Sequence, residues 1–407
     1  MLLNHIIPSI KKHISLLVIV FGAGCLFLSN IITKNIFSKE EYGKYSVIIT
    51  YFSLLYLFGI LGTEQGFIRF SNRKEKGVIE THKSQIILVF CIALFSSIVG
   101  GIFFKFYYSN ILLNNILLFI SGFCIIILLF LFNTLRLNED FALSQLITNY
   151  WRISLFVLSL IYLLWNHSSF ENYITIVAIN IVLGTVLAFF FVLRKIKFTY
   201  SKTKIDLSST FFHFFLAIST FTLLTFSDRF LVENKFSIEE FGNYFFLTNL
   251  FLAPYSILQN YIGFKQLVLF KNNFTVEYFN QQNRRSIIIG LFLGAFLLVA
   301  ANIVSYLKIL DFDFKNTIFI VLLLLLTGIL RLYSASILAA FEAKVSVETL
   351  KKSNIIIVVI TLVVLTIAIF AAKSIEAILF CVATIGILRA LVQRHLILKQ
   401  HQKQLEK

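Results

Sequence analysis

Charged residues are scarce in this chain: they make up 14% of its 407 residues, whereas hydrophobic residues make up 58%. A soluble domain carries roughly 25% charged residues, so the polar material here is too little to cover a water-facing globule of this size. Long apolar runs such as 316–330 lack the alternation of a barrel strand. Because a backbone in lipid must satisfy its own hydrogen bonds, the sequence predicts a helical membrane protein.

Residues that carry enzyme chemistry are equally sparse. The four cysteines fall within apolar runs and show no metal spacing, which indicates apolar packing. The seven histidines share no spacing, and the sequence contains neither paired carboxylates nor a glycine-rich phosphate loop. A membrane-embedded polymerase would also need a sizeable outer loop, which the apolar runs leave no room for. We therefore expect no enzyme, no cofactor and no metal site.

The apolar runs predict about twelve transmembrane helices, since a helix needs about 20 apolar residues to cross the bilayer. The eleventh and twelfth are separated only by the tight turn "AAKS". The predicted spans are 14–34, 45–68, 84–105, 111–133, 142–165, 172–193, 207–232, 241–264, 286–307, 316–341, 353–372 and 374–393.

The distribution of Lys and Arg predicts the orientation, because positive residues are held on the cytoplasmic side. With the N-terminus inside, 24 of the 36 basic residues fall in inner segments and 8 in outer segments. This bias predicts that both termini are cytoplasmic. It also accounts for the formal net charge of +16 without nucleic acid, because basic residues scattered over short inner loops suit an anionic lipid leaflet.

One polar phrase occurs twice in the chain. "NIFSKEEYGKY" (Asn35–Tyr45) returns as "NKFSIEEFGNY" (Asn234–Tyr244) at an offset of 199. Ser followed by two glutamates is typical of a helix N-terminus, where acidic residues favour the positive end of the helix. Six spans separate the copies, so the sequence predicts two parallel six-helix halves, 1–197 and 207–407, joined by a cytoplasmic linker, 198–206. Parallel repeats of this kind occur in alternating-access transporters.

The residues around both copies resemble a known family. "SDRFLVENKFSIEEFGNY" is similar to the start of the second half in O-antigen and polysaccharide flippases, and "FSKEEYGKYSVIITYFSLLYLFGILGTEQGFIRF" to their first helix hairpin. These flippases belong to the multidrug/oligosaccharidyl-lipid/polysaccharide exporter superfamily. The resemblance implies export of undecaprenyl-diphosphate-linked repeat units across the bacterial inner membrane, with a polysaccharide polymerase and a chain-length regulator as further partners. We add Arg69, which ends the first hairpin, to the expected substrate-binding residues.

Charges within the hydrocarbon are costly and mark candidate functional residues. Arg152 and Arg331 lie in the middle of predicted spans, and Asp228 and Arg229 lie near the outer end of the seventh span. Arg389, near the inner end of the twelfth span, is interpreted as a snorkelling helix end. The guanidinium fork binds phosphate in two places, so Arg152 and Arg331 favour an anion-attracting cavity. Asp228 and Arg229 fit substrate contact and structural pairing equally well.

Two further residues have open interpretations. Glu64 is either a titratable group that couples transport to an ion or the partner of a cation at the rim of the bundle. Pro254 is the only proline within a predicted span, and it marks either a hinge or a kink that improves packing.

Three classes of protein compete for this sequence. A flippase for an anionic lipid-linked sugar fits the deep arginines, whereas a cation-coupled multidrug exporter of the same superfamily would favour deep acids. A scaffold gives the deep arginines no role. The sequence therefore favours the flippase and keeps the drug exporter as the alternative.

Overall fold

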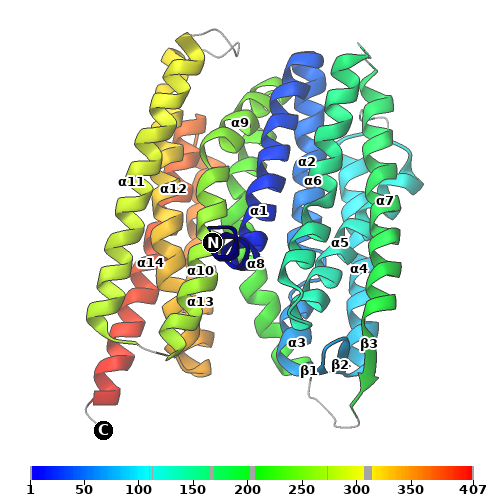
Figure 1. The fold of residues 1–407 in the computed structure, drawn as a ribbon. Helices are drawn as coiled ribbons and strands as arrows, with labels where there is room; N and C mark the ends of the chain where they lie inside the picture. The colour runs from blue at the N-terminus through cyan, green and yellow to red at the C-terminus, as the bar shows by residue number, and fades with distance from the viewer. Residues whose placement is uncertain are drawn as a thin grey trace. The chain divides into compact units, whose positions relative to one another are not determined.

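The structure is a computed structural model that describes residues 2–109, 111, 113–165, 169–201, 207–272, 274–306 and 314–405. Within them the chain forms fourteen helices and three short strands (Figure 1). The helices are α1 (Leu2–Ile36), α2 (Lys39–Phe58), α3 (Thr63–Phe70), α4 (Lys83–Tyr107), α5 (Asn115–Leu137), α6 (Phe141–Leu164), α7 (Phe170–Lys195), α8 (Leu207–Lys235), α9 (Ile238–Phe251), α10 (Ala253–Asn272), α11 (Val276–Tyr306), α12 (Phe314–Lys344), α13 (Val347–Ala371) and α14 (Ile375–Leu405). The strands are β1 (Asn72–Glu75), β2 (Val78–Thr81) and β3 (Lys197–Tyr200).

Nine of the helices in the described part are long and apolar enough to cross a membrane, so the chain is an all-α polytopic membrane protein. They are α1 from Leu17 onward, α4, α5, α6, α7, α11, α12, α13 and α14. The other three predicted spans, 45–68, 207–232 and 241–264, coincide with α2–α3, α8 and α9–α10. The count of twelve crossing helices stays a prediction.

Two predicted spans are interrupted rather than continuous. The first breaks between α2 and α3, where Leu61 and Gly62 have φ values of 49° and 82°. The left-handed conformation ends a helix, and glycine adopts it without a Cβ penalty. The second breaks at Leu252, so that Pro254 lies in the first turn of α10. There its missing N–H removes no intrahelical hydrogen bond.

The chain forms two compact units. The first contains residues 1–222 and 238–242, and the second contains residues 223–237 and 243–407. The linker predicted at 198–206 lies in part outside the described residues, because the structure describes 198–201 only. The division into two parallel halves of six helices stays a prediction.

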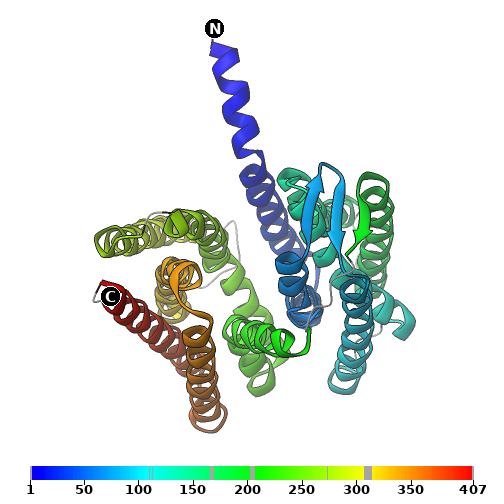
Figure 2. The same cartoon turned by 90° about the horizontal axis from the view of Figure 1, so that it is seen from below.

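In the first unit, α1 packs along α6 and α5 packs against α4 and α7. The three strands form one sheet in the order β1-β2-β3, with β1 antiparallel and β3 parallel to β2. Val78 pairs with Lys197, so the segment after α3 pairs directly with the segment after α7. Figures 1 and 2 show the strands side by side at one end of this unit. The strands were not foreseen from the sequence.

The turn between α5 and α6 joins the same end. Asn138 Oδ1 accepts a hydrogen bond of 2.7 Å from the backbone N–H of Gly77, and Lys195 pairs with Asp140 at 3.1 Å. Arg73 forms a further ion pair with Glu139. Three segments that the sequence assigns to one side of the membrane, 69–83, 134–141 and 194–201, therefore lie together. The side to which they face stays a prediction.

The first copy of the repeated phrase begins α2 as a capping box. The Ser38 hydroxyl accepts from the backbone N–H of Glu41 at 3.3 Å, and Glu41 Oε2 accepts from the backbone N–H of Ser38 at 2.9 Å. This confirms the helix start inferred from the phrase. The first turn of α9 belongs to the same unit, and a Cβ at Gly242 would lie 3.1 Å from Gly43 Cα. The two copies thus meet at the glycine that both keep.

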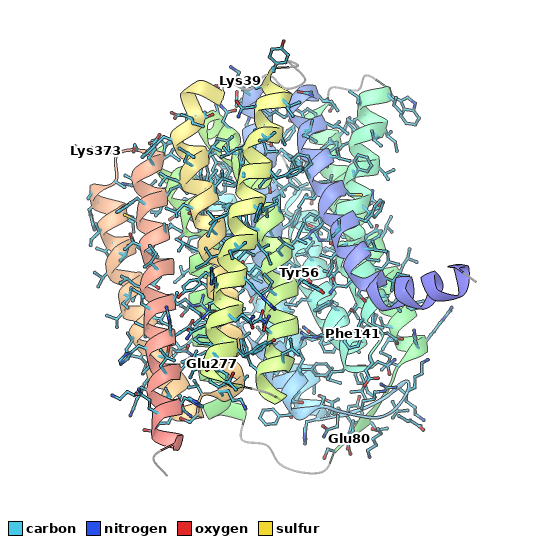
Figure 3. The ribbon with its side chains drawn as sticks, turned by 60° about the vertical axis from the view of Figure 1, so that its left-hand side comes forward. Lys39, Tyr56, Glu80, Phe141, Glu277 and Lys373 are labelled. Carbon is cyan, nitrogen blue, oxygen red and sulfur yellow. The ribbon has the colours of Figure 1, made fainter. Side chains whose placement is uncertain are left out.

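In the second unit, α12 packs against α10, α11 and α14, and α13 packs on α14. Buried aromatic residues of α10, α11 and α12, namely Phe270, Phe279 and Phe341, form a cluster with Ala390 and Ile397 of α14. This cluster fixes four helices against one another at one end of the unit. Figure 3 marks that end by Glu277 and the opposite end by Lys373.

Candidate functional site

The second unit brings together three of the predicted charged residues around a tyrosine. Asp228 and Tyr244 are 2% and 1% exposed, and the Tyr244 hydroxyl donates a hydrogen bond of 2.6 Å to Asp228 Oδ2. Asp228 Oδ1 has no hydrogen-bond partner among the described residues. A buried carboxylate with one free oxygen is costly unless another group completes it. Asp228 therefore has a vacant acceptor in the interior of the unit.

Two guanidinium groups lie near this pair. Arg229 Cζ lies 5.6 Å from the ring centre of Phe226 and 5.1 Å from that of Phe245, distances at which the ring faces attract a cation. Arg331 Nη1 donates a long hydrogen bond of 3.4 Å to the Ser256 hydroxyl. Both arginines are within electrostatic reach of the Tyr244 hydroxyl. Four helices, α8, α9, α10 and α12, thus contribute to one polar cluster.

The arginines of this cluster keep their donors largely free. Within the described part of the chain, neither Arg229 nor Arg331 forms an ion pair with a carboxylate. Aromatic faces stabilise a cation without using its N–H groups, so the fork of Arg229 remains able to bind an oxyanion. The cluster of Asp228, Arg229, Tyr244 and Arg331, which we call the arginine cluster, has two cations for one carboxylate.

The repeated phrase supplies an internal comparison for this cluster. Tyr45, the equivalent of Tyr244, donates a hydrogen bond of 3.1 Å to Asn30 Oδ1 of the preceding helix. At the offset of 199, Ser29 and Asn30 correspond to Asp228 and Arg229. The first copy therefore anchors its tyrosine with neutral residues. The charged pair of Asp228 and Arg229 is thus found in the second copy and not in the first, and its role in substrate contact or structural pairing stays a prediction.

Sequence reasoning overlooked Tyr244 as a site residue. The sequence shows that this tyrosine recurs at the last position of the repeated phrase, but it does not show that Asp228 is its hydrogen-bond partner. The hydrogen bond joins residues 16 positions apart on two helices, and only their packing brings them together.

Arg152 lies in the first unit, on α6. Its Nη1 donates to Asn149 Oδ1 at 3.0 Å, and its Cζ lies 5.6 Å from the ring centre of Trp151. Its Nε is buried and has no hydrogen-bond partner among the described residues. Tyr56, which interacts electrostatically with Arg152, lies midway along the unit in Figure 3. The depth of Arg152 in the membrane stays a prediction.

The structure places Glu64 and Arg69 on the eight-residue helix α3 of the first unit. Glu64 is 8% exposed, and its Oε2 has no hydrogen-bond partner among the described residues. No cation of the described part forms an ion pair with Glu64, so its reading as the partner of a loop cation gains no support. The side chain of Arg69 lies outside the described part of the structure. The roles of both residues stay predictions.

Pro254 lies two residues before Ser256, the partner of Arg331, at the break between α9 and α10. Its role as a hinge stays a prediction. In the described part of the chain, no group of three or more His, Cys, Asp or Glu residues is arranged to hold a metal ion.

Comparison with known proteins identifies the fold. No protein-family model matches the sequence, and no curated protein matches it. Among solved structures, the chain is similar to the lipid II flippase MurJ in an inward closed conformation, with a TM-score of 0.52 and 14% sequence identity. The similarity covers 97% of this chain and 87% of that chain. At this identity the similarity establishes a fold like that of MurJ.

Proposed function

We propose that the chain is a flippase that moves undecaprenyl-diphosphate-linked oligosaccharide repeat units from the cytoplasmic to the periplasmic leaflet of a bacterial inner membrane. The observation that carries this proposal is the arginine cluster. Arg229 and Arg331 are half-buried in the second unit and form no ion pair with a carboxylate in the described part of the chain. A protein with a similar fold is described as a lipid II flippase, which is also consistent with a lipid-linked substrate.

The chemistry of a diphosphate suits these groups. A lipid diphosphate loses the stabilisation of water and counterions when it leaves the membrane surface, and fixed cations in a low-dielectric site replace part of it. Arginine binds two phosphate oxygens with one planar fork, and each charge-assisted hydrogen bond contributes about 1.5–3 kcal/mol. The hydrogen bond from the Tyr244 hydroxyl fixes the carboxylate of Asp228 in its position near the two arginines.

Arg152 is the corresponding candidate in the first unit. Asn149 holds one of its nitrogens, and its Nε, which has no hydrogen-bond partner among the described residues, is left for a substrate. Arg69 completes the proposed set of contacts, Glu64 couples transport to an ion, and Pro254 permits α10 to change its angle during alternating access. A polysaccharide polymerase and a chain-length regulator are the proposed protein partners.

A cation-coupled multidrug exporter is the second candidate. The observation that favours it is the burial of two acids, Asp228 and Glu64, each with one oxygen that has no hydrogen-bond partner in the described part of the chain. Buried acids attract cationic drugs, whereas the neighbouring arginines repel them. The surplus of arginine around Asp228 therefore favours the flippase.

The test compares export in cells that lack the chromosomal gene and carry plasmid-borne variants. We expect Arg331→Ala or Arg152→Ala to abolish the surface polymer, leave lipid-linked repeat units on the inner leaflet and leave protein levels unchanged. Arg331→Lys should restore export only in part, because lysine keeps the charge and loses the fork. Arg285→Ala is the matched control, since Arg285 is an exposed residue of α11.

Two outcomes separate the candidates. Full export in both alanine variants would return these arginines to packing roles. An intact polymer after deletion of the gene, together with new sensitivity to cationic dyes, would replace the flippase by the drug exporter.

A further inference from the structure

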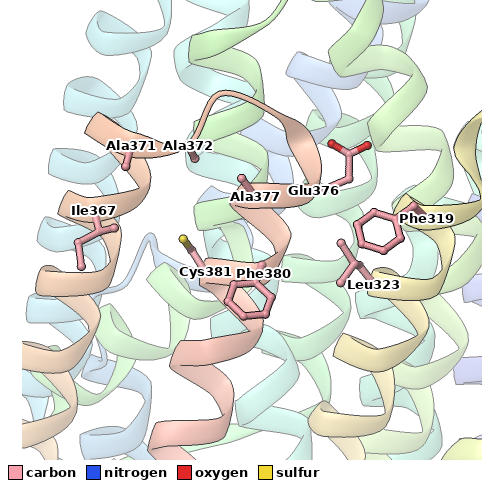
Figure 4. A pocket seen from close by; sticks show the side chains of 9 residues that line it. All are labelled: Phe319, Leu323, Ile367, Ala371, Ala372, Glu376, Ala377, Phe380 and Cys381. Carbon is pink, nitrogen blue, oxygen red and sulfur yellow. The ribbon is translucent and has the colours of Figure 1, made fainter.

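The second unit contains a hollow of about 330 Å³ between α12, α13 and α14 (Figure 4). Three alanines, Ala371, Ala372 and Ala377, give it its space, because their side chains leave room between the helices. Eight of its nine lining residues are apolar or carry only a thiol, and the ninth is Glu376. The other lining residues are Phe319, Leu323, Ile367, Phe380 and Cys381.

The hollow opens toward lipid. Phe319, Ile367 and Phe380 line it and are 60%, 52% and 65% exposed in the chain. All three belong to helices that are long and apolar enough to cross a membrane. Apolar residues exposed on such helices face hydrocarbon, so the hollow is accessible to a lipid chain from the side.

Two lysines lie at the end of the hollow. Lys235 Nζ donates a hydrogen bond of 2.7 Å to the carbonyl oxygen of Ala372, a lining residue, and exposed Lys373 follows directly in the chain. Neither lysine forms an ion pair with a carboxylate in the part of the chain that the structure describes. Glu376 has a local explanation, since it lies in the first turn of α14, where an acid favours the helix dipole.

We propose that this hollow binds a segment of one polyisoprenyl chain, with the phosphate of the same lipid at Lys235 and Lys373. Lipid tails are as apolar as the hollow, so no hydrophobic force selects the ligand. An empty hollow would lose dispersion contacts, which means that some chain fills it. The two ammonium groups at its end then select a lipid whose phosphate lies directly at the end of its chain.

The size of the hollow favours a single chain over a two-tailed phospholipid. Small-molecule pockets span about 300–1,000 Å³, and 330 Å³ is at the lower end of that range. A phospholipid would place one tail inside and leave the other outside. The choice of an isoprenyl chain rests on the proposed function. On the predicted topology this end of the unit faces the periplasm, so the hollow would hold the lipid after it has crossed.

The test uses the full chain in nanodiscs of phosphatidylcholine and a polyisoprenyl monophosphate that carries a diazirine in its chain. After illumination, mass spectrometry locates the crosslinked residues. We expect labelling concentrated at the lining residues of α13 and α14. Excess unlabelled polyisoprenyl phosphate should reduce it, whereas phosphatidylglycerol, an anionic lipid with two tails, should reduce it far less.

Variants test the shape and the charge separately. Ala371→Phe fills the hollow and should lower labelling about tenfold, whereas Val363→Phe, at an exposed position of the same helix, should not. Lys235→Gln combined with Lys373→Gln should lower labelling to a similar extent. Equal labelling in all variants, labelling spread over the lipid-facing surface, or equal competition by phosphatidylglycerol would overturn the proposal. The competition by unlabelled lipids is measured on the unchanged chain, so it tests the proposal even where a variant fails to fold.

The outcome is independent of the export test. Specific labelling in a chain whose deletion leaves the polymer intact would refute the proposed function and keep the lipid site. Loss of export on deletion together with unspecific labelling would refute the lipid site alone.

Discussion

Replacement of Tyr244 by phenylalanine tests the internal comparison between the two copies of the repeated phrase. The change removes the hydroxyl that donates to Asp228 at 2.6 Å. Asp228 is 2% exposed and its other oxygen already has no partner among the described residues. Tyr244→Phe therefore leaves both carboxylate oxygens without the hydrogen bonds that offset their burial.

The expected magnitude follows from the charge of the acceptor. Hydrogen bonds to charged groups contribute about 1.5–3 kcal/mol and neutral ones about 0.5–1.5 kcal/mol. Tyr45→Phe is the matched control, because Tyr45 donates to the neutral amide of Asn30 at 3.1 Å. We expect Tyr244→Phe to lower the free energy of unfolding by about 1 kcal/mol more than Tyr45→Phe does.

Unfolding by SDS in mixed micelles, followed by circular dichroism, measures both losses. The double variant Tyr244→Phe with Asp228→Asn should recover part of the loss, because an amide costs less to bury without a partner than a carboxylate. Equal losses of unfolding free energy in Tyr244→Phe and Tyr45→Phe would refute the inference that the charge of Asp228 strengthens the hydrogen bond of Tyr244. Strictly additive effects of Tyr244→Phe and Asp228→Asn in the double variant would refute it as well.

Two further predictions concern packing and orientation. Gly43→Ala should reduce stability and export, because a Cβ there would overlap the backbone carbonyl of Ile238. Gly24→Ala should be neutral, because a Cβ there meets nothing within 4 Å. Equal effects of both changes, measured by thermal unfolding in detergent, would contradict this reasoning. Reporter fusions should place the two termini in the cytoplasm and the segment around residue 200 on the same side as residue 75, since β2 and β3 pair. An opposite reading at residue 200 would overturn the predicted topology, in which fusions after residues 39, 75, 200, 236 and 347 read out, in, in, out and in.

The sequence predicted the helices well because their signal is local. An apolar run long enough to cross a bilayer has few alternatives to a helix. The interruption at Gly62 was missed because the apolar run continues through it, although "GILG" at 59–62 contains two glycines that mark it. The strands were missed because each is four residues long and because β3, the partner of β2, lies far along the chain.

The charged residues of the candidate site were named from the sequence, whereas Tyr244 and the contacts among them were missed. Burial cost alone marks Arg152, Asp228 and Arg331 in the sequence, since a charge within an apolar run is conspicuous. Their partners Asn149, Tyr244 and Ser256 are ordinary polar residues of membrane helices, and packing alone selects them. A sequence therefore shows which charged residues lie within apolar runs, but it does not show which residues they contact.

The pairing of β2 with β3 sets an order of events during synthesis. Val78 and its partner Lys197 are 119 residues apart (197 − 78), so β2 must wait for its partner while α4, α5, α6 and α7 enter the membrane. At about 5–20 residues per second of translation this wait lasts roughly 6–24 s. During that time β2 has an unpaired edge in the hairpin of β1 and β2. An unpaired edge can form backbone hydrogen bonds with another strand than β3. The four helices α4 to α7 bring residue 197 back to the same end of the unit, which limits that hazard.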